Sequence, residues 1–207
     1  MKRCVIIGGA PIGRYDRIRA LLREDDFCIY CDSGLRHLES LGAQPDLIIG
    51  DFDSHEKPDT DVETIVLPTV KDDTDTMFAV KEGLRRGFDD FLLVGALGGR
   101  LDHTMVNVYS LLYIDDKGKN GAIADDFSLV RLVSRTPAEI GPEWAFFSLV
   151  NIDGSAHGVT IRDAKYELDD AEIPCSFQYA TSNEPLQNKT ASVSLREGRL
   201  LLICDYE

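Results

Sequence analysis

Cysteine, positive charge and long apolar runs are all scarce in this 207-residue chain. Its 5 cysteines are few and odd in number, which argues against a disulfide framework and fits a reducing compartment. The 22 Lys and Arg are outnumbered by 36 Asp and Glu, and the net charge of -14 disfavours a protein that binds nucleic-acid phosphates. No apolar run approaches the roughly 20 residues that span a bilayer, and the first residues turn to glycine too soon for a signal peptide. We therefore expect a cytoplasmic protein without a nucleic-acid or membrane partner.

The composition is that of a folded globular protein, with 43% hydrophobic and 28% charged residues. In the first two-thirds of the chain, short β-rich runs alternate with amphipathic stretches, which is typical of α/β proteins with a mainly parallel sheet. The expected strands cover residues 4–7, 27–31, 47–49, 64–67, 91–96 and 122–124. The expected helices cover residues 14–23, 35–41, 74–86 and 103–114. We predict a Rossmann-like, mainly parallel α/β domain over residues 1–130.

After about residue 126 the pattern changes to short strands separated by turns, without a long helical stretch. Strands are expected at residues 127–133, 144–150, 159–161, 166–168, 177–180, 191–195 and 200–204. The last two are interpreted as a hairpin closing on residues 196–199, and the acidic stretch 163–172 as a solvated loop or a strand edge. We predict a C-terminal antiparallel β-sandwich over residues 131–207.

Acidic side chains come after four successive expected strands of the first domain. Asp32 comes after the second strand, Asp51 and Asp53 after the third, Asp75 after the fourth and Asp102 after the fifth. Because ligands of a parallel sheet bind beyond the carboxyl ends of its strands, these carboxylates are expected at one edge. Crowded carboxylates repel one another unless a cation lies among them, so this edge is a candidate site for Mg²⁺. Any one of them alone is equally well explained as a helix cap or turn, but four in succession favour a functional site.

The segment after the third strand places two carboxylates two residues apart. If this segment is extended, Asp51 and Asp53 point the same way and can hold one ion, while Phe52 turns into the core.

Two glycine pairs suggest where a phosphate would bind. Gly8-Gly9 and Gly98-Gly99 each come after an expected strand, where missing side chains let backbone N–H groups approach a phosphate. Arg100 is placed to make bidentate contacts with a phosphate, while Asp102 faces a metal or a substrate hydroxyl. The alternative for these two is a surface salt bridge with each other. His103 is interpreted as a residue that caps or packs the helix it begins.

A set of short motifs runs through nearly the whole chain. They are Asp32-Ser33-Gly34, the run from Gln44 to Ser54, Lys71-Asp72-Asp73-Thr74-Asp75, Gly98-Gly99-Arg100-Leu101-Asp102-His103, Lys165-Tyr166-Glu167-Leu168, Thr181-Ser182-Asn183-Glu184 and Val193-Ser194-Leu195-Arg196-Glu197-Gly198. Together, and in this order, they resemble the thiamine pyrophosphokinase family, also called the thiamine diphosphokinase family. The resemblance implies an N-terminal α/β domain and a C-terminal β-sandwich. It also implies Mg²⁺-dependent transfer of the terminal pyrophosphate of ATP to the hydroxyl of thiamine, giving thiamine diphosphate and AMP.

The resemblance further implies roles for individual residues. Asp51, Asp53 and Asp75 would hold Mg²⁺ and the triphosphate. Asp75, Arg100 and Asp102 would be catalytic, and the sequence does not choose between Asp75 and Asp102 as acceptor of the hydroxyl proton. The residues implied to contact ATP or thiamine are Gly8, Gly9, Asp32, Ser33, Lys71, Thr74, Gly99, Ser182 and Asn183.

The resemblance also implies a homodimer. Thiamine would lie where the α/β domain of one subunit meets the β-sandwich of the other, reached by Lys71 and Ser182. Residues 1–130 would then bind nucleotide and metal, and residues 131–207 would bind thiamine and support dimerisation.

Two other functions use the same features. A metal-dependent phosphohydrolase would use these carboxylates to activate water, and a nucleotide-binding sensor would bind ATP without turnover. The hydrolase would release phosphate or pyrophosphate in the absence of thiamine, which distinguishes it from the kinase.

Overall fold

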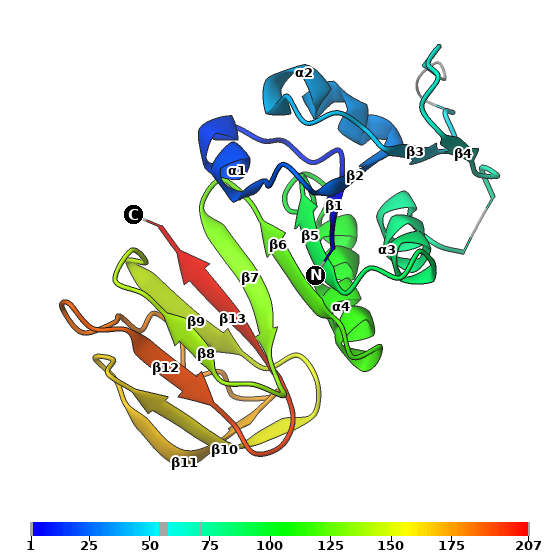
Figure 1. Ribbon diagram of the computed structural model, residues 1–207. Helices are drawn as coiled ribbons and strands as arrows, with labels where there is room; N and C mark the ends of the chain where they lie inside the picture. The colour runs from blue at the N-terminus through cyan, green and yellow to red at the C-terminus, as the bar shows by residue number, and fades with distance from the viewer. Residues whose placement is uncertain (1, 54–57, 71, 207) are drawn as a thin grey trace. The chain divides into compact units, whose positions relative to one another are not determined.

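The computed structural model describes residues 2–53, 58–70 and 72–206 and divides the chain into two compact units, Met1–Asp126 and Phe127–Glu207 (Figure 1). Among the described residues, no helix is both long enough and apolar enough to cross a membrane.

The first unit is a parallel sheet with helices in its connections. Its strands, in the order β4-β3-β2-β1-β5-β6, all pair in parallel with their neighbours. The strands are β1 (Arg3–Ile7), β2 (Phe27–Cys31), β3 (Leu47–Gly50), β4 (Thr64–Val66), β5 (Asp90–Val94) and β6 (Asn120–Ala124). The helices are α1 (Tyr15–Leu21), the 3₁₀ helix η1 (Asp32–His37), α2 (Leu38–Leu41), α3 (Asp75–Arg85) and α4 (Leu101–Asp116).

The order of the strands reverses between β1 and β5. From β1 the chain moves outward through β2, β3 and β4, and it then returns to the other side of β1 with β5 and β6. All five residues of β1 are buried, as expected for a central strand covered on both faces. In an open parallel sheet, ligands bind in the crevice at such a reversal, so a ligand is expected beside the loops after β1 and β5.

The second unit contains two antiparallel sheets. In one, β13 (Leu200–Asp205) lies between β7 (Ser128–Val133) and β9 (Phe146–Val150). In the other, the order is β11-β10-β12-β8, and the strands are β11 (Leu168–Pro174), β10 (Ser155–Arg162), β12 (Ala191–Ser194) and β8 (Ala138–Ile140).

One hydrophobic core lies between these two sheets. It combines Phe147 and Leu202 from the first sheet with Val159, Ile173 and Val193 from the second. In β8, β9, β12 and β13, alternate residues belong to this core, which is the pattern of a β-sandwich. The predicted fold class, a mainly parallel α/β region followed by an antiparallel β-sandwich, is confirmed.

Several predicted elements of the second unit differ from the structure. Residues 177–180 form no strand, because the Gln178 amide instead bonds to the backbone of Asn151 through both its oxygen and its nitrogen, each at 2.9 Å. The predicted hairpin of the last two strands is wrong, since β12 pairs with β10 and β8 whereas β13 pairs with β7 and β9. The three-residue strand β8 was not predicted, and the acidic stretch contributes to β11, an edge strand of its sheet.

Candidate active site

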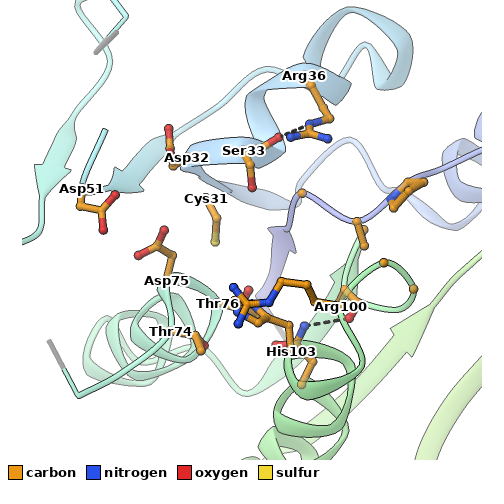
Figure 2. Close-up of a pocket in the computed structure, with 18 of the residues that line it drawn as sticks. Cys31, Asp32, Ser33, Arg36, Asp51, Thr74, Asp75, Thr76, Arg100 and His103 are labelled. Atoms are coloured by element: carbon orange, nitrogen blue, oxygen red, sulfur yellow. Dashed lines mark hydrogen bonds between the residues drawn. The ribbon is translucent and has the colours of Figure 1, made fainter. Parts of the chain in front are cut away.

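A pocket of about 900 Å³ lies at the carboxyl ends of the strands of the first unit. Segments after β1, β2, β3 and β5 and the start of α3 and α4 contribute to its wall. From the predicted site, the lining includes Gly9, Asp32, Ser33, Asp51, Asp53, Thr74, Asp75, Gly99 and Arg100. Figure 2 shows the side chains of Asp32, Asp51, Asp75 and Arg100 from these separate elements around one hollow. The position is the one that the reversal of strand order predicts.

Three carboxylates of this pocket form a compact group. Oxygen atoms of Asp32, Asp51 and Asp53 all lie within 4.8 Å of one another, close enough to share one cation. Asp32 is buried, with 8% of its surface exposed, whereas Asp53 is exposed. Gly50 allows this arrangement, because a Cβ atom at that position would lie only 2.6 Å from the Cβ of Asp32. The group therefore depends on a glycine at the end of β3.

The segment that carries Asp51 and Asp53 is turned rather than extended. Phe52 has a φ of 51°, in the left-handed region, and the N–H of Asp53 points to the carboxylate of Asp51 at 3.4 Å. Phe52 is half-buried and not part of the core, so the prediction that it turns inward from an extended segment is wrong. The two carboxylates share one side because the chain turns there.

The start of α3 supplies further acidic groups to the pocket. Thr74 caps the helix, because its hydroxyl oxygen accepts a hydrogen bond from the N–H of Met77 at 3.2 Å. The next residue, Asp75, lies in the first helical turn, where a carboxylate is favoured by the helix dipole. Figure 2 shows Asp75 directed towards the side of the pocket that holds Asp51 and Asp32. Asp73 is paired with Lys81 at 2.7 Å, so part of its charge is already balanced.

Arg100 and Asp102 form an ion pair at the start of α4. The guanidinium donates two hydrogen bonds to the carboxylate, from Nε at 3.1 Å and from Nη2 at 2.6 Å. The hydrogen bond from Arg100, with another from the N–H of His103, lowers the pKa of Asp102 to about 2. Arg100 lines the pocket, whereas Asp102 is not among its described lining residues.

The glycine pair after β1 has a packing role that the sequence did not reveal. A Cβ atom on Gly8 would lie 2.5 Å from the carbonyl oxygen of Gly95, and one on Gly9 would lie 1.9 Å from the hydroxyl of Ser33. Gly8 lies outside the described pocket lining, while Gly9 lines it. These glycines bring the β1–α1 loop close to the ends of β2 and β5. Gly98 and Gly99 both have positive φ, 94° and 69°, as a tight turn before α4 requires.

Two residues outside the predicted site hold the β1–α1 loop in place. The carboxylate of Asp126 accepts hydrogen bonds from the N–H groups of Gly13 at 2.7 Å and Arg14 at 2.8 Å. His37, which is 2% exposed, faces the carbonyl oxygen of Ala10 with Nε2 at 3.0 Å. Because a carbonyl only accepts, Nε2 carries the proton, and the neutral ring accepts at Nδ1 from the hydroxyl of Tyr15 at 2.7 Å. Burial lowers the pKa of His37, which favours this neutral form.

The predicted thiamine contacts Ser182 and Asn183 belong to the second unit. Ser182 is exposed and has a φ of 56°, and its N–H donates to the hydroxyl of Ser148 at 3.0 Å. Asn183 is buried and bonds to the backbone of Tyr166 through both its amide oxygen, at 3.0 Å, and its amide nitrogen, at 2.8 Å. Asn183 and Tyr166 line a small recess of about 50 Å³. The remaining predicted contact, Lys71, lies outside the described residues.

Sequence reasoning missed several residues that line the pocket. Arg36 lies one turn of η1 after Ser33, and Asn107 lies buried on α4 with its amide nitrogen 2.7 Å from the carbonyl oxygen of Ala96. His103, interpreted from the sequence as a capping or packing residue, also lines the pocket. The helical periodicity of α4 gives no indication of which residues face a ligand, and nothing in the sequence marks Arg36.

Fold and pocket together define a two-unit α/β protein whose pocket lies where the order of parallel strands reverses and includes the carboxylates that follow β2 and β3. Residues 18–122 match the catalytic domain of thiamin pyrophosphokinase, and residues 138–200 match the vitamin B1 binding domain of thiamin pyrophosphokinase. The chain therefore belongs to the thiamin pyrophosphokinase family.

Individual relatives agree with this membership. The thiamine pyrophosphokinase of Bacillus subtilis (strain 168) is 27% identical, with 98% of each chain covered. The thiamin pyrophosphokinase 1 of Caenorhabditis elegans is 25% identical over 87% of this chain and 80% of its own length. The crystal structure of thiamine pyrophosphokinase from Bacillus subtilis has a TM-score of 0.88 at 22% identity over the full length of both chains. The structure from Geobacillus thermodenitrificans has a TM-score of 0.85 at 25% identity, covering 99% of this chain and 98% of that one.

Proposed function

We propose that this chain transfers the terminal pyrophosphoryl group of ATP to the hydroxyl oxygen of thiamine, giving thiamine diphosphate and AMP. The proposal rests on the family match over residues 18–122, a range that includes Asp32, Asp51 and Asp53 of the pocket. A pocket of about 900 Å³ is large enough for a nucleotide, since ligand pockets commonly measure about 300–1,000 Å³.

The donor set of the pocket fits Mg²⁺. Asp32, Asp51 and Asp53 offer only oxygen atoms, which hard divalent cations prefer, and the burial of Asp32 makes an uncompensated cluster of charges costly. We propose that these three carboxylates hold the metal, with Asp75 as a further ligand from the start of α3. When bound, Mg²⁺ would neutralise charge on the triphosphate.

The chain's own residues would position the reactants. The hydroxyl oxygen of thiamine bonds to the β-phosphorus, the bond from that phosphorus to the oxygen bridging to the α-phosphorus breaks, and AMP leaves with the bridging oxygen. The hydroxyl proton goes to a carboxylate or to water. We assign the contact with this proton to Asp75, because Asp75 lines the pocket whereas Asp102 is not among the described lining residues. We also propose that Arg100 contacts a phosphate. The Arg100 guanidinium must then release the carboxylate of Asp102.

We further propose that the protein acts as a homodimer with the site shared between subunits. Ser182 and Asn183 lie in the second unit, whereas every proposed metal ligand lies in the first. A stripe of large apolar side chains on α4, the helix that begins beside Arg100, is exposed in the single chain, comprising Leu101, Met105, Val106 and Tyr109. Exposed apolar stripes of this kind mark protein contacts, and a partner's β-sandwich would cover it while bringing Ser182 to the pocket.

The test of the function is incubation with ATP, Mg²⁺ and thiamine, with chromatographic detection of AMP and thiamine diphosphate. Equal amounts of the two products are expected, and none with a thiamine analogue whose hydroxyl is replaced by hydrogen. Phosphate or pyrophosphate release without thiamine would instead indicate the hydrolase. ATP binding without turnover would indicate the sensor.

A further inference from the structure

Among the described residues that line the pocket, few are cations, although ATP carries a large negative charge. Its described lining has five carboxylates, Asp32, Asp51, Asp53, Asp73 and Asp75, and two arginines, Arg36 and Arg100. The guanidinium of Arg100 already donates two hydrogen bonds to the carboxylate of Asp102. Arg36 is therefore the arginine to examine first for contact with an anion.

The side chain of Arg36 is anchored at one nitrogen and open at the other two. Its Nε donates to the carbonyl oxygen of Ser33 at 2.8 Å, one turn earlier in η1. Within the part of the chain that the structure describes, its two Nη atoms make no hydrogen bond or ion pair. An arginine fixed through Nε presents its remaining donors in a defined direction, which lowers the entropy lost when an anion binds.

Arg36 lies away from the acidic group. In Figure 2, Asp51 is on one side of the hollow and Arg36 on the other, beyond Ser33. Arg36 is thus separated from Asp51 along the pocket. A ligand with metal-bound phosphates at one end would bring a different part of itself to Arg36.

We infer that Arg36 binds the α-phosphate of the nucleotide, the phosphate that leaves in AMP. This inference rests on the proposed function. The β- and γ-phosphates are transferred and belong with the metal-binding carboxylates. Of the two arginines in the described lining, Arg100 must first release Asp102, whereas Arg36 uses only Nε, so we assign Arg36 to the remaining α-phosphate. When the β-phosphorus breaks its bond to the bridging oxygen, that oxygen and its electron pair remain on AMP. Negative charge therefore grows on the α-phosphate, where a guanidinium stabilises it.

The test compares the binding of AMP and adenosine to wild-type protein, Arg36→Gln and Arg19→Gln by calorimetry with Mg²⁺ removed by chelation. Arg19 is a matched control, because it is also exposed, also donates to a backbone carbonyl, that of Ser40 at 2.8 Å, and lies outside the described lining of the pocket. We expect Arg36→Gln to weaken AMP binding about tenfold, as loss of one charge-assisted contact does, and to leave adenosine binding within about twofold. Arg19→Gln should bind both ligands like the wild type.

Three results would overturn the inference. Unchanged affinity of Arg36→Gln for AMP and for pyrophosphate, measured in the same way, would place Arg36 outside the nucleotide site. Equal weakening of AMP and adenosine would show that Arg36 contacts the base or supports the fold, and thermal unfolding of both variants would separate these two. Weaker binding of pyrophosphate with unchanged AMP binding would assign Arg36 to the transferred group. In each case wild-type turnover of ATP and thiamine still tests the proposed function separately.

Discussion

Arg100 holds the carboxylate of Asp102 through two hydrogen bonds from adjacent guanidinium nitrogens, although a single residue separates the two in the sequence. This pairing lowers the pKa of Asp102 to about 2, so its carboxylate stays ionised at every ordinary assay pH. We predict that Arg100→Gln raises the pKa of Asp102 towards its usual 3.8. Carboxyl carbon resonances recorded by NMR through an acid titration would measure the change.

The chain offers a matched control for this experiment. Arg14 pairs with Asp16 at the same spacing, at 3.2 Å, and lowers the pKa of that carboxyl. Arg14→Gln should therefore raise the pKa of Asp16 and leave that of Asp102 unchanged. An unaltered titration of Asp102 in Arg100→Gln would show that the ion pair does not persist in solution.

The metal assignment predicts the effect of removing one charge from the acidic group. Asp53→Asn preserves the volume of the side chain but removes a ligand charge, so we expect turnover at saturating Mg²⁺ to fall by at least about a hundredfold. The metal-free protein should unfold at the same or a slightly higher temperature, because repulsion with Asp51 and Asp32 is relieved. Turnover measured against Mg²⁺ concentration tests the first expectation, and thermal unfolding in the presence of a chelator tests the second.

Asp59→Asn is the control for this substitution. Asp59 is exposed on the segment between β3 and β4 and does not belong to the three-carboxylate group. Its loss should leave the Mg²⁺ dependence unchanged. Near wild-type turnover of Asp53→Asn would remove Asp53 from the metal site.

His37 predicts a specific loss of stability in mild acid. Burial lowers the pKa of His37 below its ordinary 6.5, so the unfolded chain takes up a proton at a higher pH than the folded chain does. Between these two pKa values the unfolded state binds more protons, and the free energy of unfolding must fall as the pH falls below 6.5. Urea unfolding at a series of pH values should show a weaker acid dependence for His37→Gln than for the wild type.

The wild-type protein is the comparison for His37→Gln. The quantity to compare is the slope of the free energy of unfolding against pH. The absolute value of that free energy falls at every pH, because His37→Gln also loses contacts to Ala10 and Tyr15. Identical slopes for wild type and His37→Gln would contradict a buried neutral imidazole.

The shared site predicts rescue between two inactive variants. Asp75→Asn damages the site through the first unit, and Ser182→Trp damages it through the second. If each site combines the first unit of one subunit with the second unit of the other, a mixed dimer contains one site with neither lesion. Exchange of subunits should then restore part of the activity, measured as thiamine diphosphate formed. Absence of rescue, with mixed dimers verified by native mass spectrometry, would reject the shared site and leave the kinase assignment intact.

The parallel topology explains why the sequence located much of this pocket. Strands β2 and β3 are parallel neighbours, so Asp32 and Asp51, which come directly after them, end at the same edge wherever the loops lead. Which carboxylates have oxygen atoms within 4.8 Å of one another is harder to predict from the sequence, because it depends on local turns. The sequence placed Asp75 with Asp51 and Asp53, whereas the three carboxylates that the structure brings within 4.8 Å include Asp32, and the role of Asp75 stays a prediction.

Arg36 and Asp126 were not predicted as functional residues, for a different reason. Arg36 was expected near the start of a helix over residues 35–41, but residues 32–37 form a 3₁₀ helix, which places residues three apart on the same side. Arg36 therefore joins Ser33 on the pocket wall. The carboxylate of Asp126 accepts a hydrogen bond from the N–H of Gly13, 113 positions away in the sequence, and no local sequence pattern predicts such a contact. The hairpin prediction failed for the same reason, because pairing between distant strands decided which sheets β12 and β13 join.

Asp126 also sets a limit on how the first unit can be shortened. The match to the family's catalytic domain ends at residue 122, which makes that position an obvious place to end an expression fragment. Such a fragment would lack the carboxylate that accepts from the N–H groups of Gly13 and Arg14, and the loop carrying Gly9 would lose its distal anchor. A fragment that preserves the pocket of the first unit must therefore extend through residue 126, even though the last residues beyond β6 do not belong to the described lining of the pocket.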